Sequence, residues 1–502
     1  MTGGVAPYQR ITALADDFAS SDADAVEALG VVWGERLQAL RNSRALAEFN
    51  ERLYRRWAIE TGILERLYAI SRGITRILVE RGLDISLIEH GSTDRPPEEI
   101  VPILRDHRNA VTYVMEFVAG DNALSLHFIK SLHQLLTKHQ DFVEAQDQFG
   151  RPLTVKLIHG DWKEQPNNPT RADGVVHSYC PPLLVQEEMD ALLRMYQDLL
   201  DRRVPTSAVS AWLHHRFTQI HPFQDGNGRV ARALAAFVFI RQRLFPVVID
   251  RDERGHYIDC LEAADGGDLT RLVTLWSRLQ TQEIERALSL SDSVLAGAPS
   301  APAGLLRERL LEAITAQARR RRAQSQSAQA AVLELGNRAF DAEVRAAVEE
   351  LRKQIDQVLT QVDPDYACSL DFSTAETRHW FKNQLVEVAR KYEYYCDLAT
   401  YHKWIRLKVR HRDAADEPTA EIVLSLHSLG RNFSGVLALS GYFAEREQDD
   451  DGRRISGPPR MIAERPLSFT YAEKFEDISR RVTEWTEMAL NIGLEELRRV
   501  LF

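Results

Sequence analysis

The spacing of apolar residues changes once along this chain of 502 residues, and that change divides the expected fold. Through about residue 290 apolar side chains recur every three or four positions, which predicts amphipathic helices. From residue 404 they alternate with a period of two, which is typical of antiparallel strands. We therefore expect a mainly α protein: an all-helical first part, followed by an α+β part with an antiparallel sheet.

Composition and turn signals place the domain boundaries. A stretch rich in alanine, proline and glycine predicts a linker. A strand-like stretch at 153–158, followed by turn-rich sequence, predicts a small β-hairpin flap within 151–182. We expect four segments: an N-terminal extension at 1–40, a helical domain at 41–292, the linker at 293–304 and an α+β domain at 305–502.

The α+β domain should begin with helices and end with one. The helices are expected at 305–324, 337–362, 376–392 and 472–500. The strands are expected at 404–410, 420–427, 435–439 and 466–471.

Charge and cysteine content exclude several classes of protein. The 63 basic and 73 acidic residues give a net charge of −10, which argues against general binding of nucleic acid. The apolar run at 233–240 is too short to span a bilayer, so we expect no membrane insertion. The four cysteines are far apart and predict neither a disulfide framework nor a zinc site. A cytoplasmic location fits this usage.

One segment concentrates chemically useful residues: His221-Pro-Phe-Gln-Asp-Gly-Asn-Gly-Arg229. Helical periodicity flanks it on both sides, while Pro222 and Gly226 interrupt the helix, so a tight loop between two helices is expected. The loop ends at a helix N-terminus. Backbone N–H groups of Gly226, Asn227 and Gly228 can therefore converge on an anion such as a phosphate.

The side chains of this loop also indicate binding of phosphate groups. Arg229 and Arg232 lie one helical turn apart and can reach oxygens of one polyphosphate. The Asp225 carboxylate suits a Mg²⁺ ion that bridges phosphates. His221 stands where the loop begins, and an imidazole there can accept a proton from an incoming hydroxyl. The segment predicts a nucleotide site.

This loop resembles the signature of the Fic (Fic/DOC) family, His-Pro-Phe-x-Asp/Glu-Gly-Asn-Gly-Arg-x-x-Arg, at every fixed position. The resemblance extends over roughly residues 40–290 and includes 160–169, which is similar to the family's flap. It implies a Mg²⁺-dependent protein adenylyltransferase that moves AMP from ATP to a Ser, Thr or Tyr hydroxyl. The Gly-Asn-Gly stretch favours transfer of AMP over transfer of phosphate.

The resemblance also implies a role for each loop residue. His221 would be the general base and Asp225 the Mg²⁺ ligand. Asn227 and the amides of Gly226 and Gly228 would hold the α-phosphate. The leaving diphosphate would be held by Arg229 and Arg232. Tyr257 and Asp265 occupy positions where related proteins have residues near the adenine, although Asp265 replaces the usual Asn.

Many Fic proteins carry an inhibitory helix with the pattern Ser/Thr-x-x-x-Glu-Gly/Asn. The stretch Thr61-Gly-Ile-Leu-Glu65-Arg66 resembles it, with Arg66 at the Gly/Asn position. Here Thr61 and Glu65 would be inhibitory, because a Glu65 carboxylate beside Arg232 replaces an oxygen of the γ-phosphate.

The expected partner is a target protein whose hydroxyl-bearing segment adds as a strand along the flap at 153–170. A homo-oligomer is left open. Two alternatives remain: removal of AMP at the same site, with Glu65 orienting water, or an interaction module that binds nucleotide without turnover. Nothing in 305–502 indicates a catalytic site.

Overall fold

The computed structural model describes residues 5–40, 43–88, 91–146, 152–169, 176–289, 327–362, 365–373, 379–411, 419–430, 435–448 and 454–501. Contacts divide the chain into two compact units, Met1–Glu27 with Ala47–Glu283 and Ala28–Leu46 with Ile284–Phe502. The expected linker at 293–304 and the expected helix at 305–324 lie outside the described residues. The predicted fold class, a helical part followed by an antiparallel sheet domain, is confirmed.

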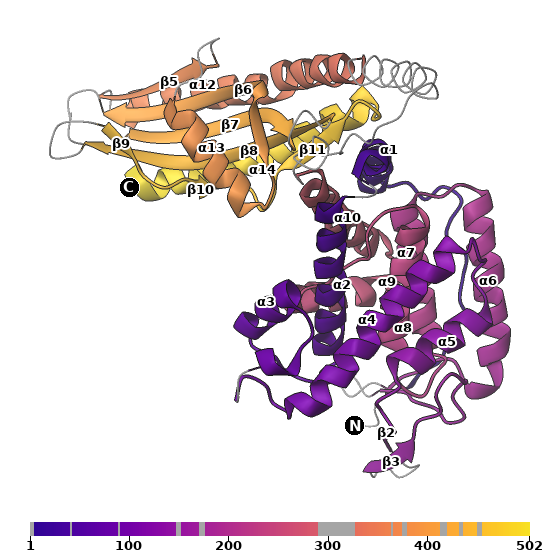
Figure 1. Ribbon diagram of the computed structural model, residues 1–502. Coiled ribbons are helices and arrows are strands. Elements are labelled where there is room, and N and C mark those ends of the chain that lie inside the picture. Colours follow the sequence, from indigo (N-terminus) through magenta and orange to yellow (C-terminus); the bar gives the residue numbers. More distant parts are fainter. Residues whose placement is uncertain are drawn as a thin grey trace, which may run out of the picture. The chain divides into compact units, whose positions relative to one another are not determined.

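Helices make up most of the first unit (Figure 1). They are α1 (Ser21–Leu40), which belongs to it only up to Glu27, α2 (Arg44–Leu64), which belongs to it from Ala47, α3 (Arg72–Arg81), α4 (Pro97–Ala119), α5 (Leu126–Leu136), α6 (Val185–Asp201), α7 (Thr206–Ile220), α8 (Asn227–Arg241), α9 (Arg254–Asp265) and α10 (Thr270–Leu288), which belongs to it up to Glu283, with short 3₁₀ turns η1 (Ile85–Leu87), η2 (Pro182–Leu184) and η3 (Arg251–Glu253).

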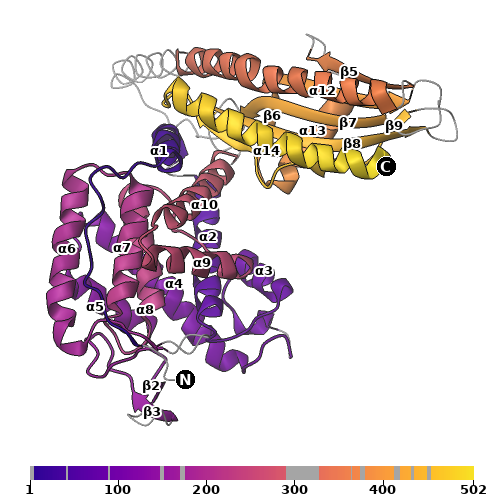
Figure 2. The same ribbon diagram turned by 180° about the vertical axis from the view of Figure 1, so that it is seen from behind.

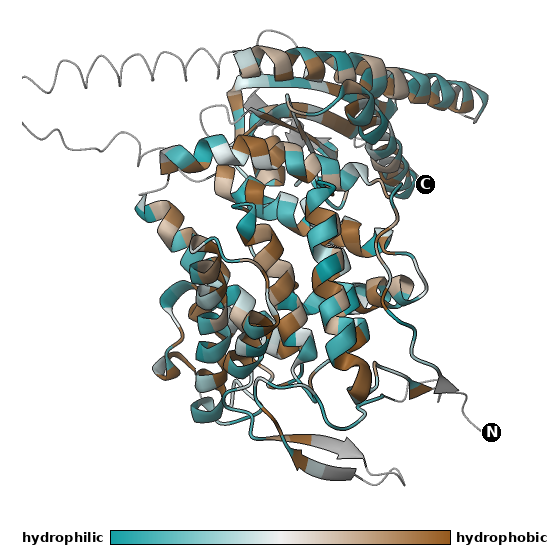
Figure 3. Ribbon diagram, turned by 90° about the vertical axis from the view of Figure 1, so that its right-hand side faces the viewer, coloured by the Kyte–Doolittle hydropathy of each residue, from teal (hydrophilic) through white to brown (hydrophobic). Residues whose placement is uncertain are grey.

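Two consecutive helices, α7 and α8, form the core of this unit. They pack against each other, and α8 also contacts α4 and α5. Both are buried along almost their whole length, and α8 contains the apolar run at 233–240. The outer helices alternate between hydrophilic and hydrophobic residues, as Figure 3 shows. The loop between α7 and α8 is therefore held between two fixed helix ends.

The flap is a hairpin, but it begins earlier than predicted. Strand β2 (Phe142–Gln146) pairs antiparallel with β3 (Pro152–Lys156), and Val143 lies opposite Val155. Two further short strands, β1 (Val5–Ala6) and β4 (Val176–His177), pair in parallel. Residues 157–169 are not strand, and this corrects the expectation of a hairpin across 151–182.

The second unit contains a seven-stranded antiparallel sheet. Along its main path the order is β10 (Arg460–Met461), β8 (Val436–Gln448), β7 (Thr419–Leu429), β6 (Cys396–His411) and β5 (Tyr366–Phe372); β9 (Arg454–Ser456) and β11 (Leu467–Thr470) also pair with β8. In the central strand β7, Leu424 lies opposite Ile405 of β6 and Gly441 of β8. Strands β5, β9 and β10 were not predicted.

Helices lie on both faces of this sheet. The π-helix η5 (Phe340–Arg345) leads into α12 (Ala346–Val362), and α14 (Phe475–Leu501) ends the described chain. Figure 2 shows α12 and α14 across one face, where Val348, Leu424 and Ile478 belong to one apolar core. Helix α13 (His379–Lys391) lies on the other face, with Phe381 against Trp404.

No helix within the described ranges is both long and apolar enough to cross a membrane. The four cysteines are buried and form no disulfide.

Candidate functional site

A pocket of about 340 Å³ lies beside the loop that joins α7 to α8. Its walls come from the end of α2, the end of α7, the start of α8 and one face of α9. The lining residues are Leu64, Glu65, Arg66, Tyr179, Thr218, His221, Gly228, Arg232, Arg254, Tyr257, Ile258 and Leu261. Five residues that the sequence singled out meet here: Glu65, His221, Gly228, Arg232 and Tyr257.

His221 ends α7 in a left-handed conformation, with φ at 54°. Such a conformation costs a non-glycine residue about 1 kcal/mol or more. The Nδ1 atom lies 3.2 Å from the carbonyl of Thr218 and donates to it, while the Tyr179 ring stacks on the imidazole at 3.8 Å. This tautomer leaves Nε2 as the basic nitrogen.

Burial lowers the pKa of His221 to about 3, and the nearby Lys163 charge adds to the shift. The Thr218 carbonyl and the Asp225 charge oppose the shift, while His177 adds slightly to it. His221 is therefore a neutral base at physiological pH.

Two glycines shape the N-terminus of α8. Gly226 has φ at 78° and precedes the first helical residue, and a Cβ there would lie 2.8 Å from Cγ2 of Thr137. A Cβ on Gly228 would lie 2.3 Å from Oε1 of Glu65. Because Gly228 has no side chain, the Glu65 carboxylate reaches the positive end of α8, the place where the sequence predicts an anion.

Glu65 also pairs with the last arginine of the loop. Nη2 of Arg232 donates to Oε1 of Glu65 at 2.7 Å and to the backbone carbonyl of Thr61 at 3.3 Å. Arg232 is almost completely buried, whereas the Glu65 side chain is 24% exposed. The pairing that the sequence predicted between Glu65 and Arg232 is present, and Thr61 contributes through its backbone.

Arg66 shows what the last position of the inhibitory pattern requires. Its φ is 57°, and it follows the last turn of α2, where the Glu65 N–H bonds to the Thr61 carbonyl at 3.3 Å. Gly and Asn adopt this left-handed conformation at the lowest energetic cost. Arg66 adopts it too, so α2 ends as it would with Gly or Asn at this position, and Glu65 reaches Arg232.

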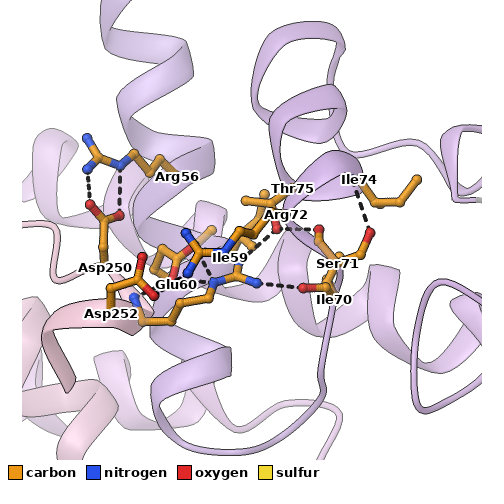
Figure 4. A network of polar contacts seen from close by, with 12 residues as sticks. Arg56, Ile59, Glu60, Ile70, Ser71, Arg72, Ile74, Thr75, Asp250 and Asp252 are labelled. Atoms are coloured by element: carbon orange, nitrogen blue, oxygen red, sulfur yellow. Dashed lines mark hydrogen bonds and ion pairs between the residues drawn. The ribbon is translucent and has the colours of Figure 1, made fainter. Parts of the chain in front are cut away.

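A network of ion pairs fixes the last turns of α2 (Figure 4). The buried Glu60 accepts from the side chain of Arg251 at 2.7 Å and from its backbone N–H at 3.0 Å. Arg56 donates to Asp250 through two nitrogens and to Glu283 at 3.0 Å. These contacts tie α2 to η3 and α10, so the position of Glu65 is set by groups outside the pocket.

Removing Glu60 should destabilise this unit much more than removing an exposed glutamate. Glu60→Ala leaves the largely buried Arg251 without its carboxylate, which costs about 3 kcal/mol or more. The control is Glu80→Ala, because Glu80 pairs with Arg52 across exposed surface and such pairs contribute less than about 1 kcal/mol. Chemical denaturation should show this difference; equal losses would contradict it.

Three loop residues, Asp225, Asn227 and Arg229, are not among those that line the pocket. Arg229 donates to the Leu136 carbonyl at 3.0 Å, to Gln140 at 2.6 Å and to Asp225 at 3.3 Å. The amide of Asn227 brackets Phe223, accepting from its N–H at 2.9 Å and donating to its carbonyl at 2.8 Å. These contacts hold the shape of the loop, and the phosphate-binding roles expected of Arg229 and the Asn227 side chain stay predictions.

Asp225 is ionised. Burial favours its neutral form, but the Arg229 charge, the Gln140 amide and the Gly226 N–H together lower its pKa. Its side chain is 34% exposed. In the described part of the chain no group of three or more His, Cys, Asp or Glu side chains could hold a metal ion.

Of the two residues predicted near the adenine, one lines the pocket and the other does not. Tyr257 lines the pocket, stacks on Trp276, and its hydroxyl lies 2.8 Å from Nε2 of His214. Asp265 lies two turns further along α9, 3.0 Å from Nε2 of His215, and does not line the pocket. Asp265 thus pairs with a buried histidine, and its expected place near the adenine stays a prediction.

Sequence reasoning missed several lining residues. Arg254, Ile258 and Leu261 follow the i, i+4, i+7 spacing of one face of α9, the face that also carries Tyr257. That spacing could have identified them once Tyr257 was selected. Tyr179 had no motif to mark it.

Part of the chain that contains this loop is similar to known proteins. Residues 123–239 match the Fic/DOC family. A protein adenylyltransferase of Caenorhabditis elegans is 24% identical over 260 residues, which are 51% of this chain and 46% of that protein. A protein adenylyltransferase of Culex quinquefasciatus is 39% identical over 150 residues, 29% of each chain. This chain thus spans about half or less of the length of these Fic relatives.

Among solved structures, a Fic domain-containing signaling protein of Bacteroides thetaiotaomicron is 20% identical. It aligns with 56% of this chain and 100% of its own, with a TM-score of 0.41.

Proposed function

We propose that this chain is a protein adenylyltransferase, which transfers AMP from ATP to a Ser, Thr or Tyr hydroxyl of a target protein. The observation that carries the proposal is the shared pocket: a neutral imidazole with a basic Nε2, a helix N-terminus and a buried arginine line one space. The Fic/DOC match over residues 123–239 and the names of the relatives support the same reaction.

In the proposed reaction, Nε2 of His221 accepts the proton of the target hydroxyl. The hydroxyl oxygen forms a bond to the α-phosphorus, and the bond between that phosphorus and the oxygen bridging to the β-phosphate breaks. Backbone N–H groups at the start of α8 stabilise the charge on the α-phosphate, and Arg232 stabilises the leaving diphosphate. The negative charge of the nucleotide raises the pKa of His221 and strengthens it as a base.

Asp225 fits a Mg²⁺ ion that arrives with the nucleotide. Mg²⁺ in nucleotide sites commonly uses one or two protein carboxylates and completes its shell with phosphate oxygens and water. Asp225 offers one ionised and partly exposed carboxylate, held in place by Gln140 and Arg229. The ion would neutralise charge on the phosphates.

Asp225→Ala should remove most of the Mg²⁺ dependence of AMP transfer together with most of the rate, by about 10² or more, because this carboxylate is the metal ligand that the loop offers. The measurement is a Mg²⁺ titration of AMP labelling in both proteins. Full stimulation of the variant by Mg²⁺ would place the ion elsewhere.

The pH dependence of transfer should lack the acid limb of an ordinary histidine. A depressed pKa means that the active neutral form of His221 persists as the pH falls through its usual value near 6.5, and is lost only near the lowered value of about 3. The kcat/KM of the Glu65→Gly protein should stay nearly constant from about pH 7.5 to pH 5.5. A tenfold loss across that interval would contradict the neutral, buried His221.

The target segment is proposed to add along the edge of β3 that does not pair with β2. Strand β3 pairs on one side with β2 within the described residues. Main-chain hydrogen bonds along its other edge would fix the register of a target segment.

The experiment that tests the proposal is labelling of a cell lysate by the purified chain with α-labelled ATP and Mg²⁺, followed by mass spectrometry. AMP on hydroxyl side chains of target proteins supports the proposal. Release of AMP from a pre-modified target without new labelling would favour AMP removal, with Glu65 orienting water. Absence of any covalent label would favour a nucleotide-binding interaction module.

A further inference from the structure

Four successive backbone carbonyls of the active loop (residues 221–228) accept hydrogen bonds from residues that do not line the pocket. Lys163 donates its backbone N–H to the Pro222 carbonyl at 2.8 Å. The side-chain amide of Asn167 donates to the Phe223 carbonyl at 2.8 Å and to the Gln224 carbonyl at 3.3 Å. The segment at 163–167, which follows the β2–β3 hairpin, thus contacts three consecutive carbonyls of the loop.

The next carbonyl, that of Asp225, is engaged by α5. The Gly160 N–H donates to Nδ1 of His133 at 2.8 Å, so Nε2 of His133 carries the proton and donates to the Asp225 carbonyl at 3.0 Å. The His133 ring also stacks on Phe223 at 3.8 Å. With four successive carbonyls held on the outer side, the loop is fixed in the conformation that leads its backbone into the N-terminus of α8.

Lys163 sets the orientation of the Asn167 amide. Its ammonium group donates to Oδ1 of Asn167 at 2.7 Å, and this contact leaves the Asn167 Nδ2 to face the two loop carbonyls. Lys163 is only 4% exposed, and its ammonium also lies 5.8 Å from the Tyr179 ring that stacks on His221. A buried charge held in this way costs free energy, so its retention beside the loop indicates a specific task.

We infer that Lys163 and Asn167 are positioning residues of the active loop, which act on the reaction by holding Pro222 to Gln224 and so placing His221 and the α8 N-terminus for transfer. The inference rests on the proposed function where its test measures the rate of AMP transfer. A second measurement reports the conformation of the loop and does not depend on that function. Misplacement of reacting groups by about 1 Å can lower a rate on the order of 10²-fold.

The test uses an isosteric change with a matched control. Asn167→Asp replaces the donating amide with an oxygen that repels both carbonyls. Asn168→Asp adds the same charge one residue away, where the native side chain already uses its oxygen to accept the Tyr179 N–H at 2.9 Å. In the Glu65→Gly protein, Asn167→Asp should lower kcat at least about tenfold with the KM for ATP changed less than about threefold, and Asn168→Asp should change neither.

Amide hydrogen exchange of residues 223–228 gives a readout that does not need activity. Asn167→Asp should accelerate this exchange relative to Asn168→Asp, and Lys163→Met should do so to a smaller degree, with similar thermal midpoints for all three. Equal exchange and equal kcat for the Asn167→Asp and Asn168→Asp proteins would overturn the inference. If the Glu65→Gly parent transfers no AMP, the proposed function fails, while the exchange comparison still decides whether Asn167 holds the loop.

Discussion

Replacing Glu65 with glycine should raise AMP transfer by about ten- to hundredfold, the factor that corresponds to one charge-assisted contact. In the resting protein the Glu65 carboxylate lies against Arg232 at 2.7 Å and close to Gly228, where it occupies the anion position at the start of α8. Without it, Arg232 can bind the γ-phosphate and the α-phosphate can turn in line with the attacking hydroxyl. Self-labelling with α-labelled ATP measures the gain.

The double variant decides whether the gain passes through Arg232. Glu65→Gly combined with Arg232→Ala should lose it, because removing a competitor cannot restore a missing arginine, and two groups in contact give non-additive effects. Thermal midpoints of the single and double variants control for folding. Equal labelling by wild type and Glu65→Gly across ATP concentrations would show that the Thr61–Arg66 stretch packs against its neighbours and does not inhibit transfer.

His221→Ala should lower transfer by about 10² to 10⁴ while ATP binding persists, since the imidazole contacts the incoming hydroxyl and not the phosphates. The change is best made in the Glu65→Gly protein, where the rate is high enough to measure a large loss. Nucleotide affinity is measured separately by calorimetry.

The control for this loss is His256→Ala, which removes a histidine from the exposed side of α9, outside the pocket lining. It should leave the rate unchanged. If the His221→Ala protein transferred AMP as fast as the His256→Ala protein, His221 would not be the general base.

The loop and the contact between Glu65 and Arg232 could be predicted because each lies in a short stretch of chemically distinctive residues. Glycines, a histidine and two arginines within twelve positions restrict both backbone and chemistry, and the structure brings His221, Gly228 and Arg232 to one pocket with Glu65. Arg66 departed from the expected pattern, yet the left-handed conformation at that position is one an arginine can adopt.

Side-chain directions could not be predicted, because the partners lie far away in the sequence. Arg229 and Asp225 turn towards Gln140, about ninety positions earlier, and Asp265 turns towards His215. Spacing within the loop contains no information on these contacts. The contacts of Arg229 and Asp265 with Gln140 and His215 were not predicted for this reason.

The predicted strand boundaries were wrong where the alternation of apolar and polar residues was weak or interrupted. Phe142-Val-Glu-Ala-Gln146 has no clear period of two, so β2 was missed and the hairpin was placed too late in the chain. Strand β6 begins at Cys396, eight positions before the predicted start, because its register shifts between Asp397 and His402 and this irregularity breaks the pattern.

The most direct test of AMP transfer compares two labels in the Glu65→Gly protein with Mg²⁺. ATP labelled at the α-phosphate should leave a covalent label on protein, and ATP labelled at the γ-phosphate should leave none, because the diphosphate departs. Retention of the γ-label, or of neither label, would contradict the proposed reaction.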